Sequence, residues 1–143
     1  PLLMSEKMSL KDMNKRVDFC LNRVDLKGAH DLFPSELSGG MQKRVAIARA
    51  ISLNPKYLFC DEPNSGLDPT TATVIDNLLK EITYENGITT VINTHDMNSV
   101  MDIGDNIVFI KEGVKKWEGD KKSFLSSKDE DLSQFKSSSK LFV

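Results

Sequence analysis

Apolar residues recur at the spacing of an α-helix in three segments of the chain, residues 9–28, 38–54 and 69–85. Ser9 and Asp68 stand at two of these helix starts, where a side-chain oxygen can accept a hydrogen bond from an exposed backbone N–H. A glycine or an Asn-Pro pair stands at or just after the end of each segment, which is typical of a helix end. The pattern therefore predicts three helices of several turns each.

Short apolar runs alternate with these helices. Residues 57–60 and 88–93 are typical of strands in a parallel sheet, and because the first run is continuous we expect it to be covered on both faces. Residues 96–103 predict a short helix, and residues 106–110 and 114–117 predict a hairpin. One or two short helices and a frayed Ser/Lys-rich end follow. The alternation indicates an α/β fold with a mostly parallel sheet.

Composition narrows the function classes. The 143 residues have the length of about one domain, and the contents of 39% hydrophobic and 28% charged residues are ordinary for a folded chain. The formal charge of −2 argues against nucleic-acid or anionic-membrane binding driven by bulk charge. No apolar run approaches the roughly 18 residues of a membrane span. Cys20 and Cys60 form neither a metal-ligand spacing nor a disulfide framework, which fits a reducing, cytoplasmic compartment.

The start of the second helix carries the first candidate chemistry. Ser38, Gly39 and Gly40 open the helix, so backbone N–H groups and the positive end of the helix dipole can face an anion with no Cβ in the way. Gln42, on the same helix, can orient the loop that precedes it or can be a solvated residue of the helix face. The structural alternative is a serine N-cap with two glycines that form a tight helix entry.

Acidic residues follow the first apolar strand. Asp61 and Glu62 come where open α/β sheets bind ligands, so one carboxylate can bind Mg²⁺ and the next can polarise a water. The alternative is a solvated acidic turn. Asp68 is a helix cap whatever else it does, and His95, after the second strand, can reach a phosphate oxygen or serve a structural role.

Taken in order, these segments resemble the ATP-binding subunits of ABC transporters. Residues 37–41 (Leu-Ser-Gly-Gly-Met) resemble the family signature, with Met41 where Gln is commoner. Residues 58–62 resemble the Walker B motif with its catalytic glutamate, and residues 65–68 resemble the D-loop. His95 corresponds to the switch histidine of the H-loop.

The resemblance spans about residues 7–124 and implies a fold. We expect part of an α/β P-loop NTPase domain, with helices on both faces of a mostly parallel sheet and part of the helical subdomain. Residues 1–56 would be the remnant of the helical subdomain with the signature helix. Residues 57–119 would be the core with Walker B, D-loop and H-loop, and residues 120–143 the C-terminal helices and tail.

The resemblance also implies ATP and Mg²⁺ as cofactors and a head-to-tail homodimer bound to transmembrane permease subunits on the inner face of the cell membrane, with no nucleic acid. Asp61 would support Mg²⁺, Glu62 would be the general base, and His95 would sense or stabilise the γ-phosphate. Other family positions would contact the cofactor across the dimer or couple its two sites: Ser38, Gly39, Gly40, Gln42 and Asp68.

Two motifs of the family are missing from the sequence. No stretch satisfies the phosphate-binding loop G-x-x-x-x-G-K-[ST], and no glutamine occupies the Q-loop position. Because both precede the signature in the family, we expect the chain to be the C-terminal portion of a nucleotide-binding domain and to be inactive alone. A narrower resemblance, in residues 28–29, 34–37 and 129–135 together with Met41, is to ATPases of bacterial phospholipid transporters, and implies an MCE-type lipid-binding partner.

Alternatives from other classes stay open. An ABC-type ATPase that moves no solute would usually carry coiled-coil insertions or tandem domains, and neither occurs here. A non-catalytic binding module would use the signature helix only for docking, and the absent phosphate-binding loop favours it for the chain as printed. An unrelated α/β hydrolase would need a G-x-S-x-G motif, which the sequence lacks.

Overall fold

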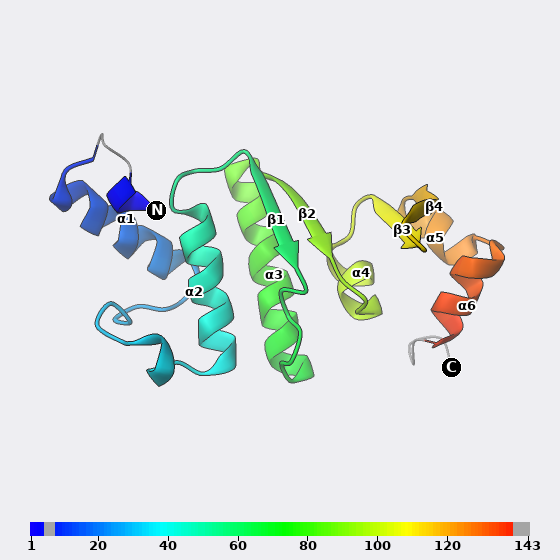
Figure 1. Ribbon diagram of the computed structural model, residues 1–143, viewed down its shortest axis with the longest axis horizontal. Helices are drawn as coiled ribbons and strands as arrows, with labels where there is room; N and C mark the ends of the chain where they lie inside the picture. The colour runs from blue at the N-terminus through cyan, green and yellow to red at the C-terminus, as the bar shows by residue number, and fades with distance from the viewer. Residues whose placement is uncertain (5–7, 139–143) are drawn as a thin grey trace. The chain divides into compact units, whose positions relative to one another are not determined.

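The computed structural model describes residues 1–4 and 8–138, and these divide into two compact units between Asn93 and Thr94 (Figure 1). Of the predicted frayed Ser/Lys-rich end, residues 137–140, the first two residues are helical, and residues 139–143 lie outside the described residues. Within the described part of the chain, no helix combines the length and the hydropathy that crossing a bilayer requires.

The first unit contains the three predicted helices: α1 (Leu10–Arg23), α2 (Gly39–Ile51) and α3 (Pro69–Asn86). Each begins after its expected cap, because the side chains of Ser9, Ser38 and Asp68 accept hydrogen bonds from backbone N–H groups three residues later. Two short 3₁₀ turns accompany them, η1 (Leu2–Met4) and η2 (Pro34–Glu36).

Helix α1 ends earlier than the expected stop at Gly28. Asp25 adopts a left-handed conformation with φ of 54°, and the N–H of Leu26 donates to the carbonyl of Leu21 at 2.9 Å. Leu21 and Leu26 are both buried, which completes a Schellman-type helix end. The expectation was wrong because an aspartate, rather than the nearest glycine, provides the left-handed residue.

The first unit has a two-stranded parallel sheet of β1 (Tyr57–Asp61) and β2 (Thr89–Asn93). In its register Asp61 lies opposite Asn93, so both strands end at the same edge. Leu58 of β1 packs with residues of all three helices in one hydrophobic core. The buried members of this core are Cys20, Leu21, Val24, Leu26, Ile47, Ala48, Ile51, Leu58, Ile75, Leu78, Leu79, Ile82 and Ile88.

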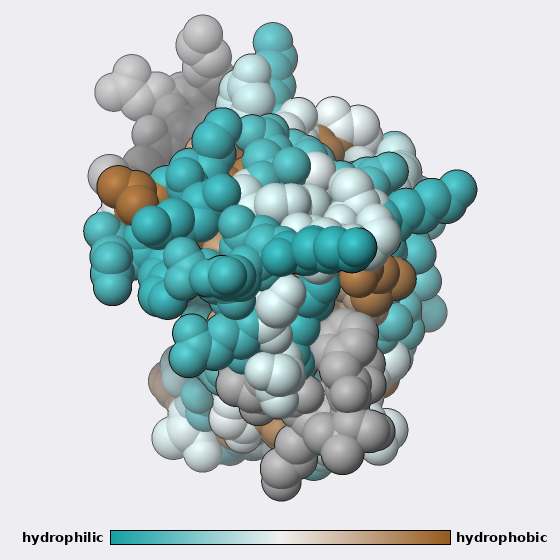
Figure 2. Space-filling view, turned by 90° about the vertical axis from the view of Figure 1, so that its right-hand side faces the viewer, coloured by the Kyte–Doolittle hydropathy of each residue, from teal (hydrophilic) through white to brown (hydrophobic). Residues whose placement is uncertain are grey.

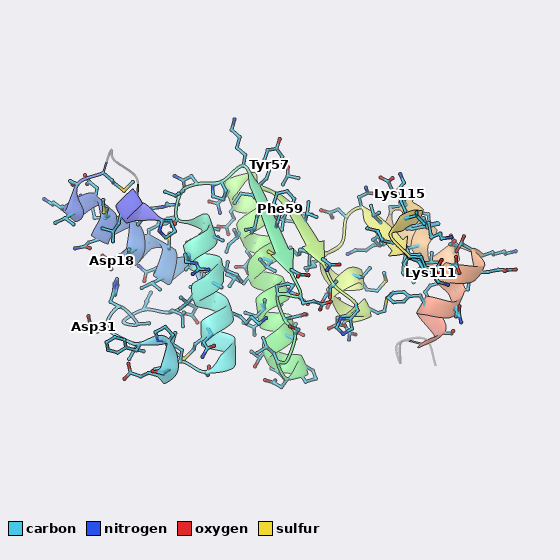
Figure 3. All side chains as sticks on the ribbon, in the orientation of Figure 1. Asp18, Asp31, Tyr57, Phe59, Lys111 and Lys115 are labelled. Atoms are coloured by element: carbon cyan, nitrogen blue, oxygen red, sulfur yellow. The ribbon has the colours of Figure 1, made fainter. Side chains whose placement is uncertain are left out.

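The first strand is covered on one face only, within the described part of the first unit. Leu58 is buried, whereas Tyr57 and Phe59 are 64% and 74% exposed (Figure 3). Val91 of β2 lies on the same side and is 50% exposed. The expectation of a strand buried on both faces was therefore wrong, because a continuous apolar run cannot distinguish burial on one face from burial on two.

The second unit begins with α4 (Met97–Ile103), followed by an antiparallel hairpin of β3 (Ile107–Lys111) and β4 (Val114–Gly119). Helices α5 (Lys121–Ser126) and α6 (Glu130–Ser138) complete it. The predicted short helix, hairpin and C-terminal helices are thus confirmed. Its own core contains Met97, Ile107, Phe124 and Leu132. On the face drawn in Figure 2 hydrophilic residues predominate, and hydrophobic ones are scattered among them.

Candidate functional site

The opening of α2 lies at the surface of the first unit. The Oγ of Ser38 accepts from the N–H of Met41 at 3.3 Å, and its carbonyl accepts from the N–H of Gln42 at 2.9 Å. Ser38 and Gly39 are exposed. Because the first N–H groups of an α-helix have no partner within the helix, an exposed opening of this kind can present donors to an anion. Ser38 therefore caps the helix and also stands where an anion can approach.

The two glycines of this turn have different surroundings. Gly40 is buried, and a Cβ there would come within 2.8 Å of the Cγ2 methyl of Thr71 in α3. A Cβ on Gly39 would lie 3.6 Å from Leu67, an ordinary contact distance. Gly40 is thus required by the close approach of α2 and α3, whereas Gly39 keeps an exposed surface.

Gln42 is engaged with the loop before the helix. Its Nε2 donates to the carbonyls of Pro34 and Leu37, at 3.1 and 3.2 Å. These bonds attach the amide to η2 and to the residue before Ser38. Its place among the cofactor-binding residues stays a prediction.

The carboxylate of Asp61 lies at the edge where both parallel strands end. It is exposed, and its Oδ1 accepts a hydrogen bond from the Nδ2 of Asn93 at 2.6 Å. Parallel strands bring their carboxyl ends to one edge, and ligands of open α/β sheets bind there. Asn93 therefore orients the carboxylate that the sequence assigns to Mg²⁺.

Glu62 begins a turn with an unusual backbone. Its φ is 46°, in the left-handed region that non-glycine residues rarely adopt. The N–H of Glu62 donates to the carbonyl of Asn93 at 2.9 Å, and its own carbonyl accepts from the N–H and the Oγ of Ser65 at 3.2 and 3.0 Å. Contacts on both sides of the residue thus maintain a conformation that the chain alone would disfavour.

Residues 65–68 lead directly into α3. Gly66 has φ of 76°, which a glycine adopts at little cost, and Asp68 caps the helix. The carboxylate of Asp68 accepts from the hydroxyl of Thr71 at 2.5 Å and from its N–H at 3.0 Å. These bonds, with the hydroxyl contributing most, lower the pKa of Asp68. Thr71 therefore contacts Asp68 and also lies against Gly40.

A buried polar pair fixes the turn from the inside. Asn64 and Asp76 are 5% and 3% exposed, and the Nδ2 of Asn64 donates to both carboxylate oxygens of Asp76 at 3.3 Å. A buried carboxylate requires such partners. The pair connects the turn after Glu62 to the middle of α3.

His95 belongs to the second unit, two residues after the end of β2. It is exposed, and the next residue, Asp96, caps α4 by accepting from the N–H of Asn98 at 2.9 Å. The role of His95 as a γ-phosphate sensor stays a prediction.

Some of these residues fit an anion or a metal ion. Residues 1–4 and 8–138 contain no group of three or more His, Cys, Asp and Glu side chains that could hold a metal ion. Asp61 fits as one oxygen ligand of an Mg²⁺ whose remaining ligands are phosphate oxygens and water. The exposed opening of α2 fits an anionic group.

The sequence interpretation missed several residues of this region. Lys43 donates to the carbonyl of Glu62, and Asn93 donates to the carboxylate of Asp61. Asn64, within the turn, pairs with Asp76. These contacts join residues that are 12 to 32 positions apart in the sequence. Asn93 could have been found from the sequence, because it ends a predicted strand, as Asp61 does. The others have no local pattern, because nothing near them in the sequence indicates what they contact.

Sequence comparisons relate this chain to known proteins. Residues 2–65 match the ABC transporter family. The methionine import ATP-binding protein MetN 3 of Pectobacterium atrosepticum is 47% identical over 102 residues, which cover 71% of this chain and 30% of that protein. MetN of Geobacillus kaustophilus is 45% identical over 103 residues, 72% of this chain and 30% of that protein. MetN 1 of Staphylococcus aureus is 44% identical over 113 residues, 79% of this chain and 33% of that protein.

Solved structures show the same likeness. The ATP-binding cassette MJ0796, in a dimeric post-hydrolysis state bound to ADP and Pi, is 37% identical with a TM-score of 0.73 over 84% of this chain and 53% of that chain. The ADP conformation of MJ1267, an ATP-binding cassette of an ABC transporter, is 30% identical with a TM-score of 0.80 over 97% of this chain and 57% of that chain.

The chain thus spans about a third of the length of the curated relatives it matches and about half of the solved cassettes. The expected fold class, part of an ATP-binding cassette, is confirmed. The narrower resemblance to phospholipid-transport ATPases has no support in these relatives, which are named for methionine import.

Proposed function

Starting from an ATP-binding domain of the ABC transporter type, whose fold and sequence this chain shares in part, we propose that it provides the signature, Walker B, D-loop and H-loop segments of an ATP-hydrolysing transporter subunit. One observation carries the proposal. Asp61 and the turn of Glu62 lie at the carboxyl edge of a parallel sheet, in the same unit as the exposed opening of α2.

Phosphate binding across a dimer is the first proposed role. Ser38 and Gly39 would bind a phosphate group of the nucleotide held by a second copy, through backbone N–H groups and the dipole of the 13-residue helix α2. Gly40 would act by allowing α2 to approach α3 closely, because Thr71 occupies the space of a Cβ. Gln42 would orient the loop that leads into Ser38.

The carboxylates at the edge of the sheet would act on the reaction itself. ATP bound with Mg²⁺ supplies a phosphoanhydride bond whose γ-phosphorus is open to attack by water. Asp61, oriented by Asn93, would offer an oxygen to the metal. Glu62 would accept or orient a proton of the attacking water at its carboxylate.

Two further residues would connect the sites of the dimer. Asp68 ends the segment that resembles the D-loop and caps α3. It would couple one site to the other. His95 would contact the γ-phosphate through its imidazole.

The proposed partners are a second copy and transmembrane permease subunits, on the cytoplasmic face of the membrane, with no nucleic acid. The substrate class comes from the relatives, whose names state methionine import, so we propose an importer of an amino acid of this kind. The same relatives give no support to phospholipid transport or to an MCE-type partner, and neither is retained.

Hydrolysis would also require a phosphate-binding loop, which the printed sequence does not contain. In P-loop ATPases this loop and its lysine bind the β- and γ-phosphates. We therefore propose that the 143 residues alone do not turn over ATP, and that the protein expressed from its complete open reading frame does. Single-turnover hydrolysis by the 143 residues alone would contradict this.

The trans contact is tested by a pair of substitutions at one exposed position, in the protein from the complete open reading frame. Gly39→Asp places a carboxylate beside the phosphate, so ATP-dependent dimerisation should be lost. Gly39→Ala adds only a methyl group at an ordinary contact distance of 3.6 Å and should largely retain it. The measurement is size-exclusion chromatography with and without ATP. Dimerisation that survives Gly39→Asp would refute the trans contact.

A further inference from the structure

Lys43 links helix α2, whose start would bind the nucleotide of a second copy, to the turn of Glu62, which would act on the nucleotide of its own copy. It lies in α2, and its ammonium donates to the backbone carbonyl of Glu62 at 3.2 Å, with a longer contact of 3.5 Å to the Oγ of Ser65. The side chain is half-buried, so these contacts are partly shielded from water. Helix α2 is thus hydrogen-bonded directly to the turn that begins at Glu62 in the same copy.

The bonded turn is one that needs support. Glu62 has a left-handed backbone, which costs a non-glycine residue free energy, and it persists only where surrounding contacts determine it. Asn93 and Ser65 provide neutral hydrogen bonds to its N–H and carbonyl. Lys43 provides the charged donor, and charge-assisted bonds are stronger than neutral ones.

The direction of the coupling follows from the geometry. A movement of α2 displaces the ammonium of Lys43, and the carbonyl of Glu62 is 3.2 Å away, so the turn must follow or lose its bond. In a head-to-tail dimer, Ser38 at the start of this helix would face the nucleotide of the second copy. Glu62 would face the nucleotide of its own copy.

We infer that Lys43 is a positioning residue. It maintains the left-handed backbone of Glu62, and it transmits a movement of α2 to the turn that begins at Glu62. The inference rests on the proposed function for its consequence in ATP hydrolysis. The bond itself, and its effect on the turn, stand independently of that function.

Three variants of the protein from the complete open reading frame test this. Lys43→Met keeps the aliphatic length and removes the donor, and Lys43→Arg restores a cationic donor. Arg49→Met is the matched control, because Arg49 is an exposed cation on the same helix. We expect Lys43→Met to lower kcat for ATP hydrolysis about tenfold, in line with the loss of one bond to a charged group. The KM for ATP should change less than about twofold, Lys43→Arg should recover most of kcat, and Arg49→Met should match wild type.

Hydrogen–deuterium exchange gives a readout that does not depend on hydrolysis. Lys43→Met should accelerate exchange in residues 61–67, while exchange in the buried part of α3 stays unchanged and Arg49→Met has no effect. Unchanged kcat and unchanged exchange in Lys43→Met would overturn the inference. So would a general loss of thermal stability with kcat and KM affected together, which is the outcome of a merely structural role.

The two proposals fail separately. If the wild-type protein hydrolyses no ATP, the proposed function fails, and exchange in residues 61–67 still decides whether Lys43 positions the turn. If the wild type hydrolyses ATP and Lys43→Met behaves as Arg49→Met does in both measurements, only the inference about Lys43 fails.

Discussion

Two glutamates with left-handed backbones, one in each unit, are maintained by different kinds of contact. Glu112 and Gly113 have φ of 54° and 74° in the two-residue turn between β3 and β4. Positive φ at both central residues is what the tight turn of a hairpin requires, so the flanking strands are sufficient. Glu62 has φ of 46°, and its bonds come from Asn93 and Lys43, which are distant in the sequence, as well as from its own turn.

The two glutamates differ in what offsets the free-energy cost of the left-handed backbone. A left-handed non-glycine residue costs roughly 1–2 kcal/mol. At Glu112 this cost is the local consequence of closing a hairpin. At Glu62 no hairpin demands it, and residues from α2 and β2 maintain it, as is typical of functional sites. The first unit therefore contains a turn that tertiary contacts shape, and the second a turn that its own neighbours shape.

The same substitution at the two glutamates should have the most unequal effect. Glu62→Gln retains the size of the side chain and removes its basicity, so ATP hydrolysis by the protein from the complete open reading frame should fall at least about 100-fold. ATP binding should persist, and a closed dimer should accumulate because its contacts are no longer removed by hydrolysis. Glu112→Gln is the matched control and should hydrolyse at the wild-type rate.

Steady-state hydrolysis and size-exclusion chromatography with ATP measure both effects. Unchanged turnover in Glu62→Gln would reject the general-base assignment. An equal loss in Glu112→Gln would remove the contrast between the two turns.

The close approach of α2 and α3 gives the next largest effect. Gly40→Ala would place a Cβ 2.8 Å from the Cγ2 methyl of Thr71, which is fixed on a β-branched side chain. We expect the free energy of unfolding to fall by about 1–3 kcal/mol. Thr71→Ser removes that methyl group and keeps the hydroxyl that binds Asp68, so the double variant should recover much of the loss.

A double-mutant cycle by urea denaturation measures this coupling. Gly39→Ala, on the exposed neighbour with 3.6 Å of clearance, is the control and should cost little. If Gly40→Ala and Thr71→Ser prove additive, the methyl group is not what excludes a side chain at Gly40.

Local structure could be predicted from the sequence where its causes are local. The starts of the long helices at Ser9, Ser38 and Asp68 were predicted and are confirmed, because a cap acts on an N–H three residues away. The end of α1 was not predicted, because no residue near Asp25 in the sequence indicates that it adopts a left-handed conformation. The exposed face of β1, with Phe59, was also missed, since the run is apolar on both sides.

The candidate site divides in the same way. The identities of Asp61 and Glu62 came from the position of acids after a strand and from resemblance to a family. The contacts that orient them come from Asn93 and Lys43, 32 and 19 residues away, and no local pattern predicts such pairs. The narrower family assignment rested on Met41 and on loop and tail residues, and the relatives do not support it.

The smallest predicted effect is on the pKa of the aspartates that cap α3 in the first unit and α5 in the second. It separates the two roles of Thr71, whose hydroxyl binds Asp68 and whose methyl group lies near Gly40. Asp68 is bonded by Thr71, and Asp120 at the start of α5 is bonded by the hydroxyl of Ser123 at 2.5 Å. In both cases the hydroxyl is the first cause that lowers the pKa of the aspartate. Thr71→Val keeps the methyl group near Gly40 and removes the hydroxyl, so the pKa of Asp68 should rise toward about 3.9, the ordinary value.

An NMR titration of the two carboxyl groups measures this shift. A lowered folded pKa stabilises the fold above the unfolded value of about 3.9, and the contribution is lost as pH falls through the folded pKa. Thr71→Val should therefore weaken the fold slightly at neutral pH and make the acid-induced loss smaller. Ser123→Ala should raise the pKa of Asp120 and leave that of Asp68 unchanged. A pKa of Asp68 that does not move in Thr71→Val would mean that the backbone N–H groups at the start of α3, rather than the hydroxyl, lower it.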